Sequence, residues 1–377
     1  PSPIPDGLTW ETATTYDLGV DFEAFNGRLN FSADIYRKKT TDMYVVGEEL
    51  PAVYGNSAPK GNYADMHTDG WEASISWRNT HTVGGKPLSY NIKVSVWDNT
   101  SKITRYTSKT GTLPTNYKVN YYESMTLGEI WGYQIDGLFQ TDEEAAAYQA
   151  EIDHSLIAKN ILQTATGKYK GLKAGDPKFV DLDGNGRIDD GEKTANNRGD
   201  MRIIGNSRPR YNYSGSINLG WNGFDISAFF QGVGRQHRYP DGNAMLFWGG
   251  YARPYSSFVP EHFLDDVWSE DNPDAYFPKL RGYAAQGDRH LAKVNDRYLQ
   301  NTAYCRLKNL TVGYTLPADL TRKARIDRVR VYFSGDNLAT WTALKSKYID
   351  PEQFSTDGSA RVYPFAKTFS FGLDITF

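Results

Sequence analysis

A segment near the middle of the chain carries the pattern of a calcium-binding loop. Residues 181–192 read DLDGNGRIDDGE and match D-x-[DN]-x-[DN]-G-x5-E at every position. Such a loop offers hard oxygen donors in a fixed order, a glycine at the sharp turn and a closing bidentate glutamate. The expected donors are the side chains of Asp181, Asp183, Asn185, Asp189 and Glu192 and the main-chain carbonyl of Arg187. The sequence therefore predicts a structural calcium site that makes this loop rigid, and the alternative is a solvated acidic turn that matches the pattern by coincidence.

Nothing in the sequence pairs this loop with a catalytic group. The six histidines are scattered and none lies in an H-E-x-x-H motif, and there is no G-x-S-x-G motif. Gly232-Val233-Gly234 lacks the third glycine of a dinucleotide site, and Cys305 lies in an expected strand as a packing residue. A net charge of −3 without a basic run argues against a nucleic-acid partner. We therefore expect a protein without enzyme activity.

The elements that must position the loop are strands. In the last segment, from Phe365 to Phe377, odd positions are mostly large and apolar, and even positions are small or polar. Because successive strand side chains point to opposite faces, this alternation gives one apolar and one polar face. The pattern recurs in about nine segments, with a β-bulge expected near Lys308-Asn309. The expected strands lie around 16–22, 29–35, 71–77, 90–96, 211–219, 224–230, 304–316, 329–333 and 365–377.

The expected connections alternate between short and long. The short turns contain Asn26-Gly27, Gly84-Gly85, Asn222-Gly223 and Pro317. The long connections span about 38–66, 98–208 and 232–301, with another through Asp350-Pro351-Glu352. All long connections would then lie on one side, as in outer-membrane barrels, whereas a β-sandwich has no reason to keep this asymmetry. The predicted fold is an all-β, antiparallel transmembrane β-barrel with long extracellular loops, in which residues 1–377 supply part of a larger barrel.

Composition agrees with that fold. The chain is rich in tyrosine (26) and glycine (35), its mean hydropathy is −0.60, and it has no run of about 18 apolar residues. A barrel needs no such run because its apolar surface is spread over alternate residues.

Two of the long connections have distinctive content. Within 98–208, Thr141-Asp142-Glu143-Glu144 forms a capping box that predicts a helix start. The 232–301 connection is dense in aromatic residues, which either stack on sugars or anchor a partner, or pack the loop against itself. These aromatic residues are Tyr239, Phe247, Trp248, Tyr251, Tyr255, Phe258, Trp268, Tyr276 and Phe277.

With the strands laid out, local segments resemble the C-terminal half of the SusC/RagA family of TonB-dependent outer-membrane transporters. The resemblance covers nearly the whole chain and depends on the order and spacing of several motifs. The matching segments are 8–11, 36–43, 132–139, 204–209, 230–232, 306–314, 336–338 and the phenylalanine-ended terminus.

The resemblance implies a barrel of about 22 strands with a plugged lumen. It also implies coupling to TonB, a SusD-like surface lipoprotein over the extracellular loops, and import of glycan or peptide fragments. No plug or TonB-contacting segment is recognisable here, so we expect these and the N-terminal barrel half upstream of the given chain. The alternatives are a secreted, soluble, calcium-dependent glycan-binding β-protein, and a passive porin.

Overall fold

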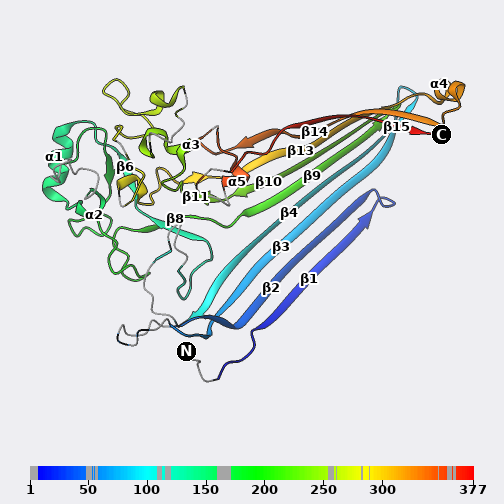
Figure 1. The fold of residues 1–377 in the computed structure, drawn as a ribbon. Coiled ribbons are helices and arrows are strands. Elements are labelled where there is room, and N and C mark those ends of the chain that lie inside the picture. The colour runs from blue at the N-terminus through cyan, green and yellow to red at the C-terminus, as the bar shows by residue number, and fades with distance from the viewer. Residues whose placement is uncertain are drawn as a thin grey trace.

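A single large sheet dominates the computed structural model (Figure 1). Its strands are antiparallel and follow the order β1-β2-β3-β4-β9-β10-β13-β14-β15, which confirms the expected antiparallel sheet. The strands are β1 Thr12–Ala24, β2 Leu29–Val46, β3 Lys60–Val83, β4 Lys86–Tyr106, β9 Arg210–Trp221, β10 Phe224–Arg235, β13 Tyr304–Thr315, β14 Arg328–Thr342 and β15 Thr368–Thr376. The structure describes residues 7–47, 53, 55, 58–107, 113–114, 120–158, 171–253, 259, 261–281, 283–287, 289–346, 348–354, 359 and 362–377.

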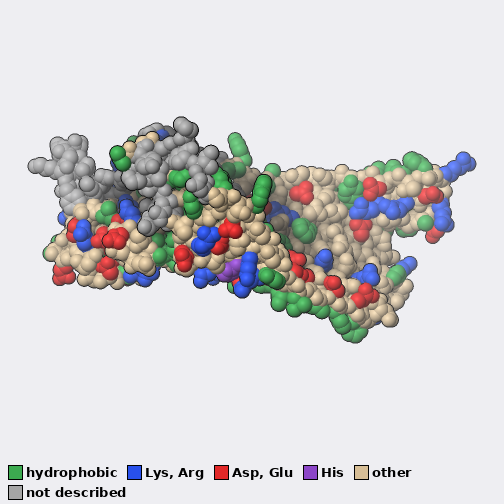
Figure 2. Space-filling view, turned by 90° about the horizontal axis from the view of Figure 1, so that it is seen from below, with side chains coloured by type: hydrophobic (Ala, Val, Ile, Leu, Met, Phe, Trp, Pro, Cys, Tyr) green, Lys and Arg blue, Asp and Glu red, His purple; other side chains and the backbone are tan. Residues whose placement is uncertain are grey.

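The sheet has one apolar face that is exposed to its surroundings. In the register, Phe31 lies between Phe22 and Ile75, and Ile75 pairs with Val94 on the other side. Ile75 is 47% exposed, and Phe371 on β15 is 83% exposed. The intervening residues, such as Ser32 and Ser74, point to the opposite face. Figure 2 shows hydrophobic side chains gathered along the lower rim of the strand region, beside a hollow with charged side chains.

Tyrosine and glycine are paired directly across neighbouring strands. Tyr36 faces Gly70 and Tyr332 faces Gly372 in the register. A Cβ on Gly70 would lie 2.2 Å from the Tyr36 ring, and one on Gly372 would lie 2.1 Å from the Tyr332 ring. The rings therefore cover backbone that only glycine leaves accessible, a known way to fix strand register. This pairing accounts for part of the high content of both residue types.

The short turns lie at one end of the sheet and the long connections at the other (Figure 1). Asn222-Gly223 and Gly84-Gly85 form two-residue turns with positive φ, as predicted. At Asn26-Gly27 the Arg28 amide donates to the Phe25 carbonyl at 3.3 Å. The turn expected at Pro317 is longer: residues 316–327 contain helix α4 (Ala318–Thr321) and the 3-10 helix η5 (Arg322–Ala324).

The boundaries of the three predicted long loops differ from the structure, least in the third, which is residues 236–303 rather than 232–301. Strand β2 continues to Val46 and β3 begins at Lys60, so the first long connection is residues 47–59 rather than 38–66. Strand β4 similarly continues to Tyr106, beyond the expected loop start at residue 98. These strand ends lack a regular alternation of apolar and polar side chains, and their ladders persist because backbone pairing does not require that alternation. The bulge predicted near Lys308-Asn309 is confirmed by the register shift between Leu307 and Asn309.

The long connections contain short elements. The predicted helix is confirmed as α1 (Asp142–Glu151): the Thr141 hydroxyl accepts from the Glu144 amide at 3.1 Å. Among the described residues, no helix is both long and apolar enough to span a lipid bilayer. The other elements are β5 Glu129–Gly132, β6 Ile135–Leu138, α2 Ser155–Ala158, β7 Pro177–Phe179, β8 Arg202–Asn206, β11 His237–Arg238, α3 Met245–Trp248, η2 Gly249–Tyr251, η3 Phe263–Asp266, η4 His290–Ala292, β12 Gln300–Asn301 and α5 Pro351–Phe354.

An arginine introduced on the apolar face of β3 should be far more destabilising than one introduced on its polar face. Ile75→Arg places a guanidinium in the centre of the apolar face and should cost about 2–4 kcal/mol of unfolding free energy in a lipid bilayer. Ser74→Arg, one residue away on the polar face, should cost much less. Urea unfolding of the full-length protein in lipid vesicles measures both. Equal costs for the two variants would contradict the assignment of the faces.

Candidate functional site in the long connections

The predicted calcium-type loop is ordered by bonds between its carboxylates and its own amides. Asp181 accepts from the amides of Gly184 and Gly186 at 2.8 and 2.9 Å, and Asp183 accepts from the Asn185 amide at 3.1 Å. The Asn185 side-chain oxygen in turn accepts from the Arg187 amide at 2.9 Å. The chain thus winds around the side-chain oxygens expected to act as ligands.

A buried carboxylate outside the predicted pattern completes the cluster. Oxygen atoms of Asp181, Asp183 and Asp200 lie within 4.8 Å of one another. The exposed fraction of Asp200 is 0%, and its oxygens accept from the amides of Leu182 and Asp189 at 2.6 and 2.8 Å. Asp200 lies outside the twelve-residue motif, so the consensus spacing gave no signal for it. The motif predicts Asp189 and Glu192 as further ligands, but among the described residues the carboxylates of these two lie outside the cluster.

The other predicted ligands lie around this cluster in different ways. Asp189 is within 3.2 Å of the Arg187 guanidinium and accepts from the Gly191 amide at 2.8 Å. Glu192 is exposed, and its amide donates to the Asn197 carbonyl at 3.0 Å. Burial raises the pKa of Asp200, and the nearby Asp183 carboxylate shifts that pKa in the same direction. The cluster therefore places one buried carboxylate, Asp200, beside the half-buried Asp181 and the exposed Asp183.

The loop is attached to the rest of the second long connection through backbone bonds. The Asp153 amide donates to the Gly186 carbonyl at 2.9 Å, and the Ile188 amide donates to the Asp153 carbonyl at 2.8 Å. The Ile188 side chain is 1% exposed and belongs to the main hydrophobic cluster. A rigid acidic loop would therefore also hold the segment that follows α1.

A buried ion pair joins the second and third long connections. Arg281 donates to both oxygens of Asp176, at 2.8 and 2.9 Å. The exposed fraction of Asp176 is 2%. Burial raises the pKa of this carboxyl, and the Arg281 charge acts in the opposite direction. Because an unpaired buried charge is costly, this contact holds residues about 100 positions apart in one geometry.

The aromatic residues of the third connection pack against each other. Trp248 lies edge-on to Phe247 and Tyr298, at centroid distances of 4.8 and 5.4 Å, and is fully buried. The Tyr251 hydroxyl donates to the Pro278 carbonyl at 2.5 Å, so its polar tip is satisfied. For the described residues the packing interpretation is confirmed: Tyr276 is half-buried with its ring 4.9 Å from that of Phe277, and the others are buried, namely Tyr239, Phe247, Trp248, Tyr251, Trp268 and Phe277. Tyr255 and Phe258 lie outside the described residues.

A buried arginine fixes the last long connection against the polar face of the sheet. Arg306 on β13 is 1% exposed; it donates to Glu352 at 2.9 Å and also pairs with Asp350. Lys308, at the bulge, pairs with Glu352 at 2.7 Å. The Phe365 ring lies 4.9 Å from the Arg306 guanidinium. These contacts bring α5 back onto the strand wall, and the predicted strand residues gave no indication of them.

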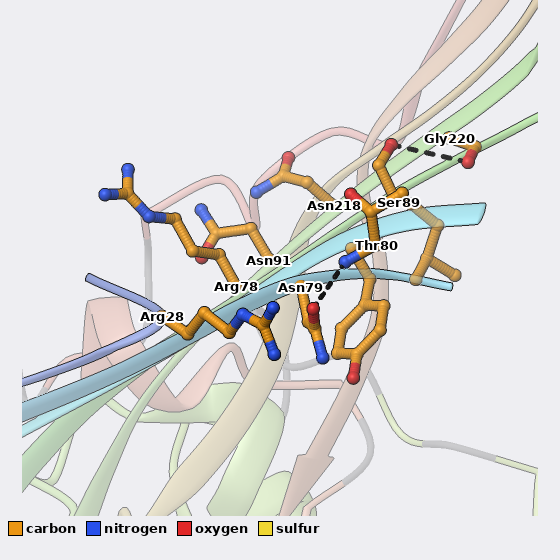
Figure 3. Close-up of a pocket in the computed structure, with 10 residues that line it drawn as sticks. Arg28, Arg78, Asn79, Thr80, Ser89, Asn91, Asn218 and Gly220 are labelled. Atoms are coloured by element: carbon orange, nitrogen blue, oxygen red, sulfur yellow. Dashed lines mark hydrogen bonds between the residues drawn. The ribbon is translucent and has the colours of Figure 1, made fainter. Parts of the chain in front are cut away.

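At the short-turn end, the polar face of the sheet has a pocket lined by basic and amide side chains. Figure 3 shows Arg28, Arg78, Asn91 and Asn218 grouped there, on strands β3, β4 and β9 and at the first turn. Arg78 donates to the Gly27 carbonyl at 2.8 Å. This end of the wall therefore presents hydrogen-bond donors to whatever fills the space beside it.

Comparison with known proteins decides the family. A sequence model described as "TonB dependent receptor-like, beta-barrel" matches residues 2–338. The chain belongs to this family. TonB-dependent receptors are outer-membrane proteins that act as receptors and transporters rather than enzymes. The apolar face of the sheet therefore contacts lipid, the polar face lines the lumen, and the long connections are extracellular.

Individual relatives agree with this assignment. TonB-dependent receptor P3 of Formosa agariphila is 27% identical over 99% of this chain and 35% of that protein. TonB-dependent receptor SusC of Bacteroides thetaiotaomicron is 25% identical over 100% of this chain and 33% of that protein. The RagAB peptide importer in its open-open state has the same fold, with a TM-score of 0.63 at 19% identity over 98% of this chain and 35% of that chain. The chain spans about a third of the length of these relatives.

Removal of the buried arginine should release the last extracellular connection. Arg306→Met leaves Asp350 and Glu352 without their main partner, so local opening of residues 348–354 should become easier by about 3 kcal/mol. Amide hydrogen exchange of the full-length protein measures this as faster exchange in that segment.

Arg330→Met is the matched control, because Arg330 pairs with Asp225 and Asp374 at the periplasmic end of the same wall. Exchange in residues 348–354 that is unchanged by Arg306→Met, or accelerated equally by Arg330→Met, would contradict the assigned role.

Proposed function

We propose that this chain is the C-terminal wall and loop region of a transporter that imports oligomeric nutrients across the outer membrane. The observation that carries the proposal is the family match over residues 2–338 together with the packed extracellular connections. The aromatic cluster and the Asp176–Arg281 pair hold these connections in one packed, ordered arrangement. A firm surface over the lumen suits capture of a large cargo before its passage.

Two kinds of partner follow from this proposal. SusC-like and RagA-like receptors work with surface lipoproteins of the SusD and RagB type, and we propose such a lid above the packed connections of this chain. We also propose that the polar lumen wall, including Arg28 and Arg78, faces a plug supplied by an upstream part of the protein. TonB would act through that upstream part.

The cargo class is glycan or peptide fragments. Likeness to the RagAB peptide importer supports an oligomeric cargo, and the choice between glycan and peptide fragments is decided by the experiment below. Membership of an outer-membrane family removes the alternative of a secreted, soluble glycan-binding protein.

Native mass spectrometry of the full-length protein, extracted in detergent from outer membranes, tests the assembly. The expected result is a complex with a surface lipoprotein, together with cargo oligomers whose masses identify sugars or peptides. Uptake of the identified oligomer by cells should then stop when TonB is inactivated. A protein recovered without a lipoprotein, or uptake that persists without TonB, would contradict the proposal.

We further propose that the acidic loop binds a structural calcium ion. Calcium–oxygen distances of 2.3–2.6 Å place two ligands of one ion up to about 5 Å apart, and the three carboxylates satisfy that limit. Asp181 and Asp183 would be joined by Asp200, with the remaining predicted donors completing the shell. The bound ion would neutralise the carboxylates and keep residues 181–200 in place.

Chelation should therefore expose this loop to proteases in the full-length protein. Trypsin is a suitable probe because the loop contains Arg187 and Lys193. Asp181→Asn should give fast cleavage at these sites even with calcium present, because the motif requires aspartate at this position. Asp190→Asn is the control because Asp190 pairs with Lys193 instead. Equal rates of cleavage with and without chelator would contradict the proposed calcium site.

A further inference from the structure

The lipid-facing side of β1–β4 changes character abruptly at its extracellular end. Leu18, Ile35 and Trp71 lie side by side in the register as the last apolar row, and their exposed fractions are 70%, 59% and 38%. The next outward-facing row on the extracellular side contains Tyr16, Arg37 and Asp69. The strands continue beyond the apolar band, so these side chains lie at the level of the lipid headgroups.

One row further out, basic side chains stand next to each other on three strands. Lys39 pairs with His67 in the register, and His67 pairs with Lys102. Neighbouring strands are about 4.8 Å apart, so the two lysines stand on either side of His67 with their backbones about 10 Å apart. We call the combined surface the headgroup patch. It consists of Tyr16, Arg37, Lys39, His67, Asp69 and Lys102.

The acidic groups in and beside this patch are already paired. Asp69 accepts two bonds from Arg37, at 2.5 and 2.7 Å, which orients the guanidinium and leaves its other donors available. Asp98, below the patch on β4, is 3% exposed and accepts two bonds from Arg210, both at 2.6 Å. The remaining charge of the patch is therefore positive.

Lys39 and Lys102 differ from these residues because no carboxylate balances their positive charge. Within the described part of the chain, neither Lys39 nor Lys102 forms an ion pair, and both are exposed. The Lys39 ammonium lies 5.7 Å from the centre of the Tyr16 ring, an aromatic residue at the membrane interface. On the other side of the sheet, Arg306 and Lys308 face the lumen and are paired with carboxylates. Lys39 on β2 and Lys102 on β4 thus place two unpaired ammonium groups on the outward face, on either side of β3.

We propose that the headgroup patch binds a phosphate-bearing lipid headgroup in the outer leaflet of the outer membrane. The occupant is a lipid because the patch is continuous with the apolar band: a molecule whose headgroup lies on Lys39 and Lys102 has acyl chains that reach Leu18, Ile35 and Trp71. The charge is complementary, since Lys39 and Lys102 add two unbalanced positive charges beside the Arg37 guanidinium, whose own charge Asp69 balances. The site holds the transporter in a defined lipid shell.

Paired variants with equal charge change test the site. Lys39→Gln with Lys102→Gln removes both outward ammonium groups, and Lys38→Gln with Lys93→Gln removes two from the lumen face of the same strands, β2 and β4. The full-length protein is placed in nanodiscs that contain phosphorylated or enzymatically dephosphorylated lipid A, and native mass spectrometry measures the lipid that stays bound. Heat-dependent gel mobility confirms that each variant is folded.

The outward pair should lower the apparent affinity for phosphorylated lipid A by about fivefold for each lysine, or about 25-fold together. The lumen pair should leave that affinity unchanged, and Lys39→Arg with Lys102→Arg should keep it. Dephosphorylated lipid A should bind weakly to every form of the protein. Equal retention of the two lipids by the unmodified protein, or an equal loss in both paired variants, would overturn the proposal.

Discussion

Backbone hydrogen bonding in the bilayer is the constraint on which this structure depends. Hydrocarbon offers no partner for an amide or a carbonyl, so every strand at that depth must be paired along its whole length. The nine-stranded sheet meets this requirement through continuous antiparallel ladders from β1 to β15. β1 and β15 are the two edges of the sheet, and the wall is stable in lipid only when both edges are paired. The alternation of lipid-facing and lumen-facing side chains follows from this ladder, because the bilayer solvates only one face.

Contact with the bilayer on one face also determines which strands could be predicted from the sequence. Phe369, Phe371 and Leu373 alternate with small or polar residues because they lie in the bilayer, and the sequence predicted their strand. The strand begins at Thr368 rather than at the predicted Phe365, whose ring lies over Arg306 instead. The bulge was predictable as well, since it shifts the apolar phase near Lys308. Where β2 and β3 leave the bilayer, no solvent difference enforces alternation. The polar stretch from Lys38 therefore looked like a loop, although its backbone is paired as far as Val46.

The candidate site was predicted only where its residues are close together in the chain. Asp181 and Asp183 follow from the calcium-loop spacing, whereas Asp200 reaches the cluster from outside that motif. The pairs Asp176–Arg281 and Arg306–Asp350 depend on how the long connections fold back, which no local pattern records. The aromatic residues of the third connection also show that local sequence does not reveal tertiary packing. Their abundance was visible, but only packing around Trp248 distinguishes a buried core from a binding surface.

The most direct test of the central claim is a scan of residues 30–35 on β2 with nitroxide spin labels, in the full-length protein with Cys305 replaced by serine and reconstituted in lipid. Collision rates with oxygen report contact with lipid, and those with a water-soluble nickel complex report contact with the lumen. Phe31, Ala33 and Ile35 should favour oxygen, and Asn30, Ser32 and Asp34 should favour the nickel complex. An absence of this period-two pattern, or the opposite phase, would contradict a lipid-facing wall.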